Sequence, residues 1–188
     1  MRYALDHKAQ THERIIKEAS ARFRRDGIGA TGLQPLMKAL GLTHGGFYAH
    51  FKSKDDLVEQ ALRSAAKEAE ETIGKFFAME DPLSGLIDLY LSTEHRDSPE
   101  SGCPLPNICA ELGQTGKPSI TTDEIILHLQ SSFAKVLPGE NIEERSISIL
   151  STLVGALVLS RSTQDAKLSE QILNNTRDRL KQEIKEVR

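Results

Sequence analysis

Apolar side chains recur roughly every three to four residues along most of the chain, which is the period of one face of an α-helix. The pattern therefore predicts an all-α protein. Helices are expected at His7–Asp26, Leu33–Leu40, His44–His50, Asp55 to about Phe77, Leu83 to about Arg96, Leu105–Leu112, about Ile125 to Leu137, Glu143–Arg161 and Leu168–Val187.

The second and third of these helices are short and lie close together. Leu33–Leu40 has its apolar residues at i, i+3, i+4 and i+7, and Gly41 follows where a helix end favours positive φ. Thr43 is a suitable cap for His44–His50. Two short helices around a glycine turn predict a helix-turn-helix, in which the second helix enters the major groove of DNA.

Charge is unevenly distributed along a chain whose net charge is −3. Residues 1–63 carry eleven Lys and Arg against seven Asp and Glu, whereas residues 64–188 carry thirteen against twenty. This asymmetry suggests that the first third approaches phosphate, although a chance fluctuation explains the charge equally well without the motif. The chain has no apolar run of about 18 residues and no apolar segment near its start, so we expect a cytoplasmic protein without a membrane span.

The stretch GLTHGGFYAHFKSKDDL, preceded by IIKEASARFRRDGIGAT, resembles the DNA-binding domain of the tetracycline-repressor (TetR) family over about residues 10–62. The resemblance implies an N-terminal three-helix helix-turn-helix domain, placed at residues 1–63. A helical effector-binding and dimerisation domain is expected at residues 64–188. The long helix from Asp55 crosses the boundary near Ser64, so the two domains are expected to be joined without a flexible linker.

The start of the second short helix holds the residues expected to read DNA. Thr43 and His44 are predicted to contact bases or phosphates. Gly45 and Gly46 allow the backbone to approach the groove closely, although one glycine is simply tolerable in a braced helix. Gln34 aligns with a family position that reaches DNA. The alternative is that Gln34 only completes a capping box with Thr31.

Three further side chains are predicted to hold the DNA backbone. The counterpart of Tyr48 in the family donates its hydroxyl to a phosphate, and the alternative is a tyrosine at the edge of the core. His50 is expected to add a backbone contact. Lys54 lies in the first turn of its helix, where a positive charge opposes the helix dipole, so a nearby phosphate would explain it. The family lysine at this position contacts the backbone.

The last two predicted helices carry apolar residues on more than one face, including Val154 and Val158 in the first and Ile172 in the second. A single buried face would serve a monomer core, so the second face predicts a homodimer through a four-helix bundle formed by both pairs of helices. A twofold dimer would present two recognition helices to a palindromic operator. The alternative is a helix buried entirely within one chain.

The family resemblance implies that the C-terminal domain encloses a small apolar or amphipathic effector, with the irregular segment 98–120 as its gate. Core residues and pocket residues look alike in a sequence. The predicted lining residues are Phe76, Tyr90, Leu105, Ile108, Cys109, Leu112, Leu129, Phe133 and Leu153.

Cys103 and Cys109 are interpreted either as a redox or electrophile sensor or, preferably, as two small buried side chains. No metal site, cofactor site or catalytic motif is predicted from the spacing of His, Cys, Ser or acidic residues. The expected function is a ligand-responsive DNA-binding regulator, most simply a repressor, and not an enzyme. The alternative is a helical small-molecule binding or enzymatic protein with a vestigial helix-turn-helix.

Overall fold

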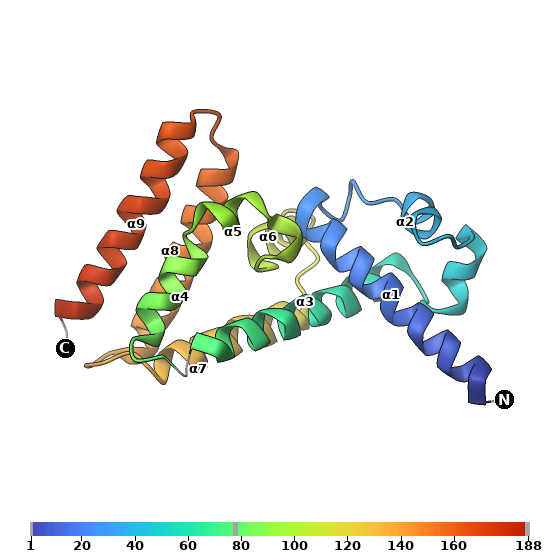
Figure 1. Cartoon of the computed structure of the whole chain (residues 1–188), viewed down its shortest axis with the longest axis horizontal. Coiled ribbons are helices and arrows are strands. Elements are labelled where there is room, and N and C mark those ends of the chain that lie inside the picture. Colours follow the sequence, from blue (N-terminus) through green and yellow to red (C-terminus); the bar gives the residue numbers. More distant parts are fainter. Residues whose placement is uncertain (1, 77–78, 187–188) are drawn as a thin grey trace.

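The computed structural model describes residues 2–76 and 79–186, with side chains from His7 onward, and all regular structure in this part of the chain is helical (Figure 1). The all-α prediction is therefore confirmed. In chain order the elements are α1 (Arg2–Asp26), α2 (Leu33–Ala39), η1 (His44–Ala49), α3 (Lys54–Phe76), α4 (Pro82–Tyr90), α5 (Thr93–Asp97), η2 (Pro99–Ser101), η3 (Leu105–Cys109), α6 (Ala110–Gln114), α7 (Ile120–Ala134), α8 (Ile142–Ser162) and α9 (Ala166–Glu186).

The N-terminal head consists of α1, α2, η1 and the start of α3, at the right of Figure 1. Its segments α2 and η1 are short, so their stability depends on burying their apolar faces against α1 and α3. Fully or almost fully buried residues from all four elements form this core: Ile15, Ala19, Phe23, Leu36, Met37, Phe47, Phe51, Leu57 and Ala61. Gly41 has φ +72°, which confirms the glycine-dependent turn between α2 and η1.

Helix α3 runs from the head into the C-terminal region as one continuous helix (Figure 1). Its buried residues, which extend from Leu57 to Ala65, lie on the face turned toward the head. Helix α3 also packs against α4 and α7, and Glu59 accepts hydrogen bonds from the hydroxyls of Ser119 and Thr121 at the start of α7. The connection is therefore helical, as predicted. Phe77 and Val187, the predicted last residues of two helices, lie outside the described residues.

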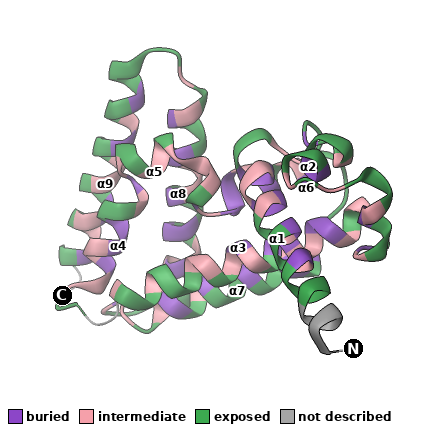
Figure 2. Cartoon of the chain, turned by 45° about the vertical axis from the view of Figure 1, so that its right-hand side comes forward, coloured by how far each residue is buried: buried purple, intermediate pink, exposed green. Residues whose placement is uncertain are grey.

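The C-terminal region is built around the antiparallel pair α8 and α9, with α4 and α7 packed against it. Figure 2 shows buried residues where these helices face one another and exposed residues on the outer side of α9. The core residues of this region include Leu83, Ile87, Ile149, Leu153, Leu157, Leu173 and Leu180. None of the described helices combines the length and the apolar character that crossing a bilayer requires.

Two predicted helices differ in the structure. The helix expected from Leu83 to Arg96 is interrupted after Tyr90, because the Ser92 side chain accepts a hydrogen bond from the His95 amide (3.1 Å) and begins a new helix, α5. The helix expected at Leu105–Leu112 begins with a turn of π-helix and extends to Gln114. Both changes lie beside the cavity described below.

Candidate nucleic-acid interface and the C-terminal cavity

The recognition segment η1 is a tight 3₁₀ turn, whereas the sequence predicted an ordinary helix. Thr43 caps it as predicted, because its hydroxyl accepts a hydrogen bond from the Gly46 amide (3.2 Å). Phe47 is buried and attaches the segment to the head core. A 3₁₀ helix has about three residues per turn, so only one side chain in three faces inward and the others face solvent.

The exposed side of the recognition segment carries His44 and Tyr48. Their rings meet edge to face with centroids 6.0 Å apart, and the Tyr48 side chain is 62% exposed. The Tyr48 ring also meets the buried ring of Phe47 edge to face, with centroids 5.2 Å apart, so the alternative of a tyrosine at the edge of the core stays open. A Cβ added at Gly45 would meet nothing within 4 Å, so protein packing does not require glycine there. Gly46 is tighter, with an added Cβ 3.4 Å from the Thr43 hydroxyl.

His50 lies at the end of the recognition segment and is half-buried. Burial and the nearby positive groups of His12 and Lys8 lower its pKa. The Nδ1 atom of His50 has no hydrogen-bond partner among the described residues. This ring nitrogen is buried, so a ligand of the head does not reach it in this structure, and the backbone contact expected of His50 stays a prediction. The neighbouring His12 is already engaged, with Nε2 2.9 Å from Oε1 of Gln60.

Lys54, the first residue of α3, is half-buried. Its ammonium donates a hydrogen bond to the carbonyl of Ile28 (2.5 Å), in the turn between α1 and α2. An ammonium has three donors, so this bond leaves capacity for another acceptor. The structure thus gives Lys54 an internal role that the sequence did not suggest.

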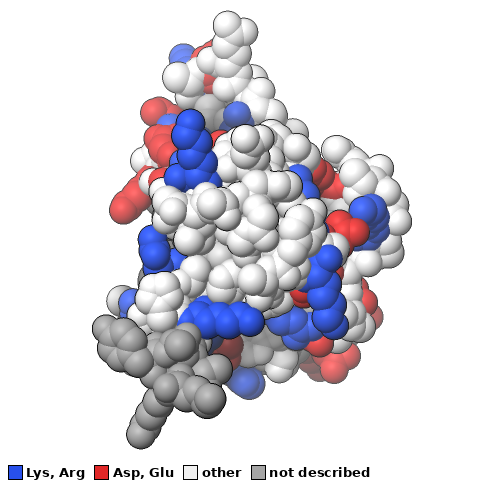
Figure 3. Space-filling view, turned by 90° about the vertical axis from the view of Figure 1, so that its right-hand side faces the viewer, with Lys and Arg blue, Asp and Glu red and all other residues white. Residues whose placement is uncertain are grey.

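Gln34 is exposed in the first turn of α2. The capping box proposed as its alternative role is wrong, because Gly32 is the N-cap and no side chain caps it. Thr31 instead donates its hydroxyl to the carbonyl of Gly27 (2.7 Å). Figure 3 looks onto the head end of the molecule and shows a mainly uncharged surface, with Lys and Arg as well as Asp and Glu side chains at its borders.

A cavity of about 220 Å³ lies between α3, α4, α7 and α8, with the segment from α5 to Cys103 as its remaining wall. Apolar side chains dominate this wall. The lining residues are Ala69, Thr72, Ile73, Leu86, Leu89, Tyr90, Glu94, His95, Ser98, Ser101, Gly102, Cys103, Leu129, Phe133 and Leu150.

Three of the nine predicted lining residues, Tyr90, Leu129 and Phe133, line this cavity. The other six lie elsewhere in the fold. Leu105, Ile108, Leu112 and Leu153 are buried in the core, and Phe76 and Cys109 are half-buried against it. The sequence did not suggest Leu86, Leu89 or Leu150, because nothing in the pattern distinguishes a cavity wall from a filled core.

His95 joins two parts of the cavity wall. Its Nδ1 is 2.8 Å from the carbonyl of Tyr90, so this nitrogen carries the proton, and Nε2 accepts a hydrogen bond from the amide of Cys103 (3.1 Å). Burial is the main cause of the lowered pKa of His95, and the charge of Arg161 adds to it. A Cβ added at Gly102 would lie 2.6 Å from Nε2, so this approach requires glycine.

Burial also raises the pKa of both cysteine thiols, that of Cys109 to about 11. Thiols with raised pKa values are weak nucleophiles, since the thiolate is the reactive form. The Sγ of Cys109 lies 3.5 Å from the hydroxyl of Thr122. These environments favour the interpretation of both cysteines, each half-buried, as structural side chains over that of a sensor.

Hydrogen bonds connect the cavity wall directly to the head. The guanidinium of Arg24, at the end of α1, is 4% exposed and donates to the carbonyl of Gly102 (3.1 Å) and to the carboxylate of Glu68 (2.8 Å). Asn107 donates to the backbone carbonyl of Arg24. The wall residue Gly102 and the head helix α1 are therefore joined through one buried side chain.

A second connection involves the carboxylate of Glu111 in α6. Its two oxygens accept hydrogen bonds from the amides of Ile28 and Gly29, each at 2.6 Å. Cβ atoms added at Gly27 or Gly29 would lie 3.0 Å from this carboxylate. The same turn receives the Lys54 ammonium at Ile28, so the C-terminal region and the start of α3 hold it from two sides.

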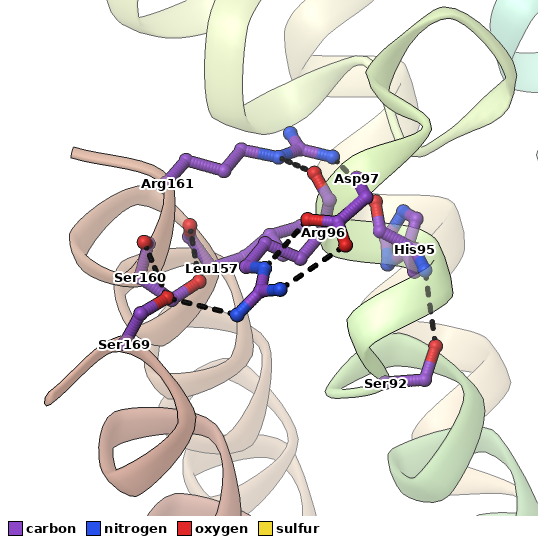
Figure 4. A network of polar contacts seen from close by, with 8 residues as sticks. All are labelled: Ser92, His95, Arg96, Asp97, Leu157, Ser160, Arg161 and Ser169. Atoms are coloured by element: carbon purple, nitrogen blue, oxygen red, sulfur yellow. Dashed lines mark hydrogen bonds and ion pairs between the residues drawn. The ribbon is translucent and has the colours of Figure 1, made fainter. Parts of the chain in front are cut away.

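The cavity wall is also tied to α8 and α9, as Figure 4 shows. Arg161 donates to the backbone carbonyls of His95 (2.7 Å) and Arg96 (3.0 Å). Arg96 in turn donates to the hydroxyl of Ser169 (3.0 Å), which donates to the carbonyl of Ser160 (2.7 Å). A displacement of α5 would therefore disturb hydrogen bonds to both helices of the C-terminal pair.

Known proteins resemble both parts of the chain. Residues 15–61 match the family model described as bacterial regulatory proteins, tetR family. An uncharacterised HTH-type transcriptional regulator of Mycobacterium tuberculosis is 25% identical over 93% of this chain and 96% of its own. The HTH-type transcriptional regulator YxaF of Bacillus subtilis is 26% identical over 84% of this chain and 88% of its own.

The fold is also that of solved regulators. The crystal structure of a TetR transcriptional regulator from Chloroflexus aurantiacus superimposes with a TM-score of 0.77, covering 97% of this chain and 98% of that one at 24% identity. The match to the family model falls on the segment whose geometry presents His44 and Tyr48 to solvent. Together these findings indicate a DNA-binding transcriptional regulator whose residues 15–61 match the DNA-binding domain of the TetR family.

Proposed function

We propose that the chain is a homodimeric repressor, released from a palindromic operator when a small effector enters the C-terminal cavity. The observation that carries this proposal is the continuous hydrogen-bonded connection from the cavity wall to the head through Arg24 and Gly102. A ligand can shift an equilibrium between two states only if it interacts differently with them. The connection supplies such a difference, because a ligand that moves Gly102 also disturbs Arg24.

The DNA contacts proposed for the head are Gln34, Thr43, His44, Gly45, Gly46, Tyr48, His50 and Lys54. His44 and Thr43, at the start of η1, would read base edges. The exposed side chain of Tyr48, the half-buried ring of His50 and the remaining donors of Lys54 would hold phosphates. Phosphate contacts fix the position of the protein on the duplex, whereas base contacts select the sequence.

The proposed dimer interface is the outer side of α8 and α9. Ser148, Thr152, Gly155 and Leu159 follow one another at i, i+4, i+7 and i+11 along α8. A Cβ added at Gly155 would meet nothing within 4 Å. Leu159 is 57% exposed and Leu168, at the start of α9, is 47% exposed. These small and apolar side chains would let a second copy pack closely and complete a four-helix bundle.

Residues 1–63 are proposed as the DNA-binding domain and residues 64–188 as the effector-binding and dimerisation domain, with a boundary inside α3. No enzymatic role is proposed, and a cytoplasmic location stays a prediction.

The test is selection of bound DNA from a random duplex pool at moderate salt. We expect an inverted repeat whose half-site centres are about one helical turn, or a multiple of it, apart. The matched variant is His44→Ala, which should relax discrimination at one base pair by about 1–3 kcal/mol. Recovery of unpatterned DNA alone, held only at low salt, would overturn the repressor proposal.

A further inference from the structure

One hydrogen-bond donor on the cavity wall has no oxygen or nitrogen acceptor among the described residues. The hydroxyl of Tyr90 is buried, and no oxygen or nitrogen atom of the described residues accepts its proton. It lies beside the thiol of Cys103, which is at best a weak acceptor. Buried polar groups are nearly always hydrogen-bonded, so this hydroxyl calls for a specific explanation.

Two neighbouring polar residues of the wall, His95 and Thr72, already have hydrogen-bond partners. Both ring nitrogens of His95 are used, by the Tyr90 carbonyl and the Cys103 amide. The hydroxyl of Thr72 donates to the carbonyl of Glu68 (3.0 Å) within α3. The Ser98 side chain is half-buried, so solvent can satisfy its hydroxyl. Tyr90 is therefore the fully buried hydroxyl of the wall, and a molecule that displaces the Cys103 thiol can accept its proton.

The charges around the cavity indicate how this hydroxyl behaves. Burial is the largest cause of the raised pKa of Tyr90, so the hydroxyl keeps its proton and acts as a donor. The half-buried guanidinium of Arg161 makes no ion pair with an acidic side chain among the described residues. Its positive charge disfavours a cation nearby, whereas the exposed Glu94 on the wall disfavours an anion.

The size of the cavity restricts its ligand further. An apolar cavity of about 150 Å³ is large enough to bind benzene, and drug-sized ligands occupy about 300–1,000 Å³. At about 220 Å³, this cavity fits one substituted ring. The apolar wall formed by Leu86, Leu129, Phe133 and Leu150 would cover the body of such a molecule.

We propose that the cavity binds an uncharged, single-ring-sized apolar molecule with one hydrogen-bond acceptor of the carbonyl type, which takes the proton of the Tyr90 hydroxyl. The inference rests on the proposed role of this cavity as the effector site. Because the hydroxyl oxygen is buried beside Cys103, the bound state requires the thiol to turn away from it. The acceptor then replaces the thiol, a weak acceptor, with an oxygen atom, a strong one.

The experiment compares two probes of similar shape, acetophenone and ethylbenzene, by calorimetric titration of the full chain without DNA. The affinity of ethylbenzene serves as the reference for apolar contact alone. Acetophenone should bind about threefold to tenfold more tightly than apolar contact alone predicts for it. Tyr90→Phe removes only the hydroxyl and should abolish this preference. Thr72→Val, which removes a cavity hydroxyl already engaged within α3, should preserve it.

Three results would overturn the inference: binding of neither probe, no preference for acetophenone, or a preference that survives in Tyr90→Phe. In Cys103→Ala the thiol beside the hydroxyl is gone, so the preference for acetophenone should stay or increase. A decrease would contradict the proposal that the thiol must turn away before the acceptor binds. Thermal unfolding of each variant shows whether it is folded. Because no DNA is present, these results are independent of the operator selection that tests the repressor proposal.

Discussion

The recognition segment of the head exposes to solvent the side chains proposed to contact DNA, whereas the side chains that line the C-terminal cavity lie between helices. The recognition segment comes from consecutive residues, His44–Ala49, held by one cap and one buried ring at Phe47. The cavity wall combines residues from Ala69 to Leu150. An interface for a large partner needs a rigid, exposed edge, while a site for a small apolar molecule needs enclosure.

The two regions meet at the turn between α1 and α2. Glu111 holds the amides of Ile28 and Gly29, and Lys54 holds the carbonyl of Ile28. This arrangement suggests how a buried event reaches an exposed surface: the turn that positions the head is bonded to the region that contains the cavity. Coupling free energies between two sites are typically about 1–3 kcal/mol, which a few such bonds can supply.

The largest expected effect is a loss of stability that differs between a side chain of the filled core and one of the cavity wall. Phe47→Ala should lower the free energy of unfolding by about 3–5 kcal/mol, because Phe47 is completely enclosed in the head. Leu129→Ala should cost only about 2 kcal/mol, near the lower end for a buried leucine, because one side of Leu129 faces the cavity. Urea unfolding of both variants checks this, and equal losses would contradict it.

The next effect concerns the connection between the regions. Glu111→Ala should destabilise the turn by about 1.5–3 kcal/mol, because two amides lose a charged acceptor. The amides of Ile28 and Gly29 should then exchange hydrogen about tenfold to a hundredfold faster. Glu111→Gln, which keeps one acceptor oxygen, should give an intermediate loss of stability and intermediate exchange rates. Unchanged exchange in both variants would show that the carboxylate does not hold the turn.

A smaller effect is expected from pH, through His95 in the cavity wall. Its pKa is lowered in the folded protein, so the unfolded chain binds the proton at a higher pH. The stability that neutral His95 contributes is therefore complete above about pH 6.5 and decreases as the pH falls toward the lowered folded value. The slope from one group is at most about 1.4 kcal/mol per pH unit.

The measurement is urea unfolding at pH 7.5 and 5.5, compared with His95→Gln, which does not titrate. The wild-type protein should lose more stability on acidification than the variant. Equal losses would mean that other groups, such as His50, account for the pH dependence.

The smallest expected effect lies on the exposed side of the head. Tyr48→Phe should weaken binding to all DNA sequences alike, about threefold to tenfold, because it removes one neutral hydrogen bond to phosphate. Lys54→Ala should also lower the dependence of log affinity on log salt by about 1. Lys185→Ala removes a lysine near the end of α9 and is the charge control. Unchanged DNA affinity in both head variants would contradict the phosphate contacts.

The sequence alone was sufficient for the parts of the molecule whose signals are local. The turn at Gly41, the cap at Thr43, the buried Phe47 and the continuous α3 all follow from spacing, capping and periodicity within a few residues. The prediction of a capping box at Thr31 was wrong, because the Thr31 hydroxyl donates a hydrogen bond to the carbonyl of Gly27 instead. The 3₁₀ form of η1 was also missed, since helix type in six residues depends on how the ends are held.

Only the tertiary structure decided which apolar residues enclose a cavity and which fill the core. Tyr90, Leu129 and Phe133 line it, while Leu105 and Leu153, with the same apolar character, are packed in the core. The links from Arg24 to Gly102 and from Glu111 to Ile28 join residues about eighty positions apart, and neither carries a local signature. Periodicity reports which face of a helix is buried, but the neighbour that covers that face is determined by the packing of the whole chain.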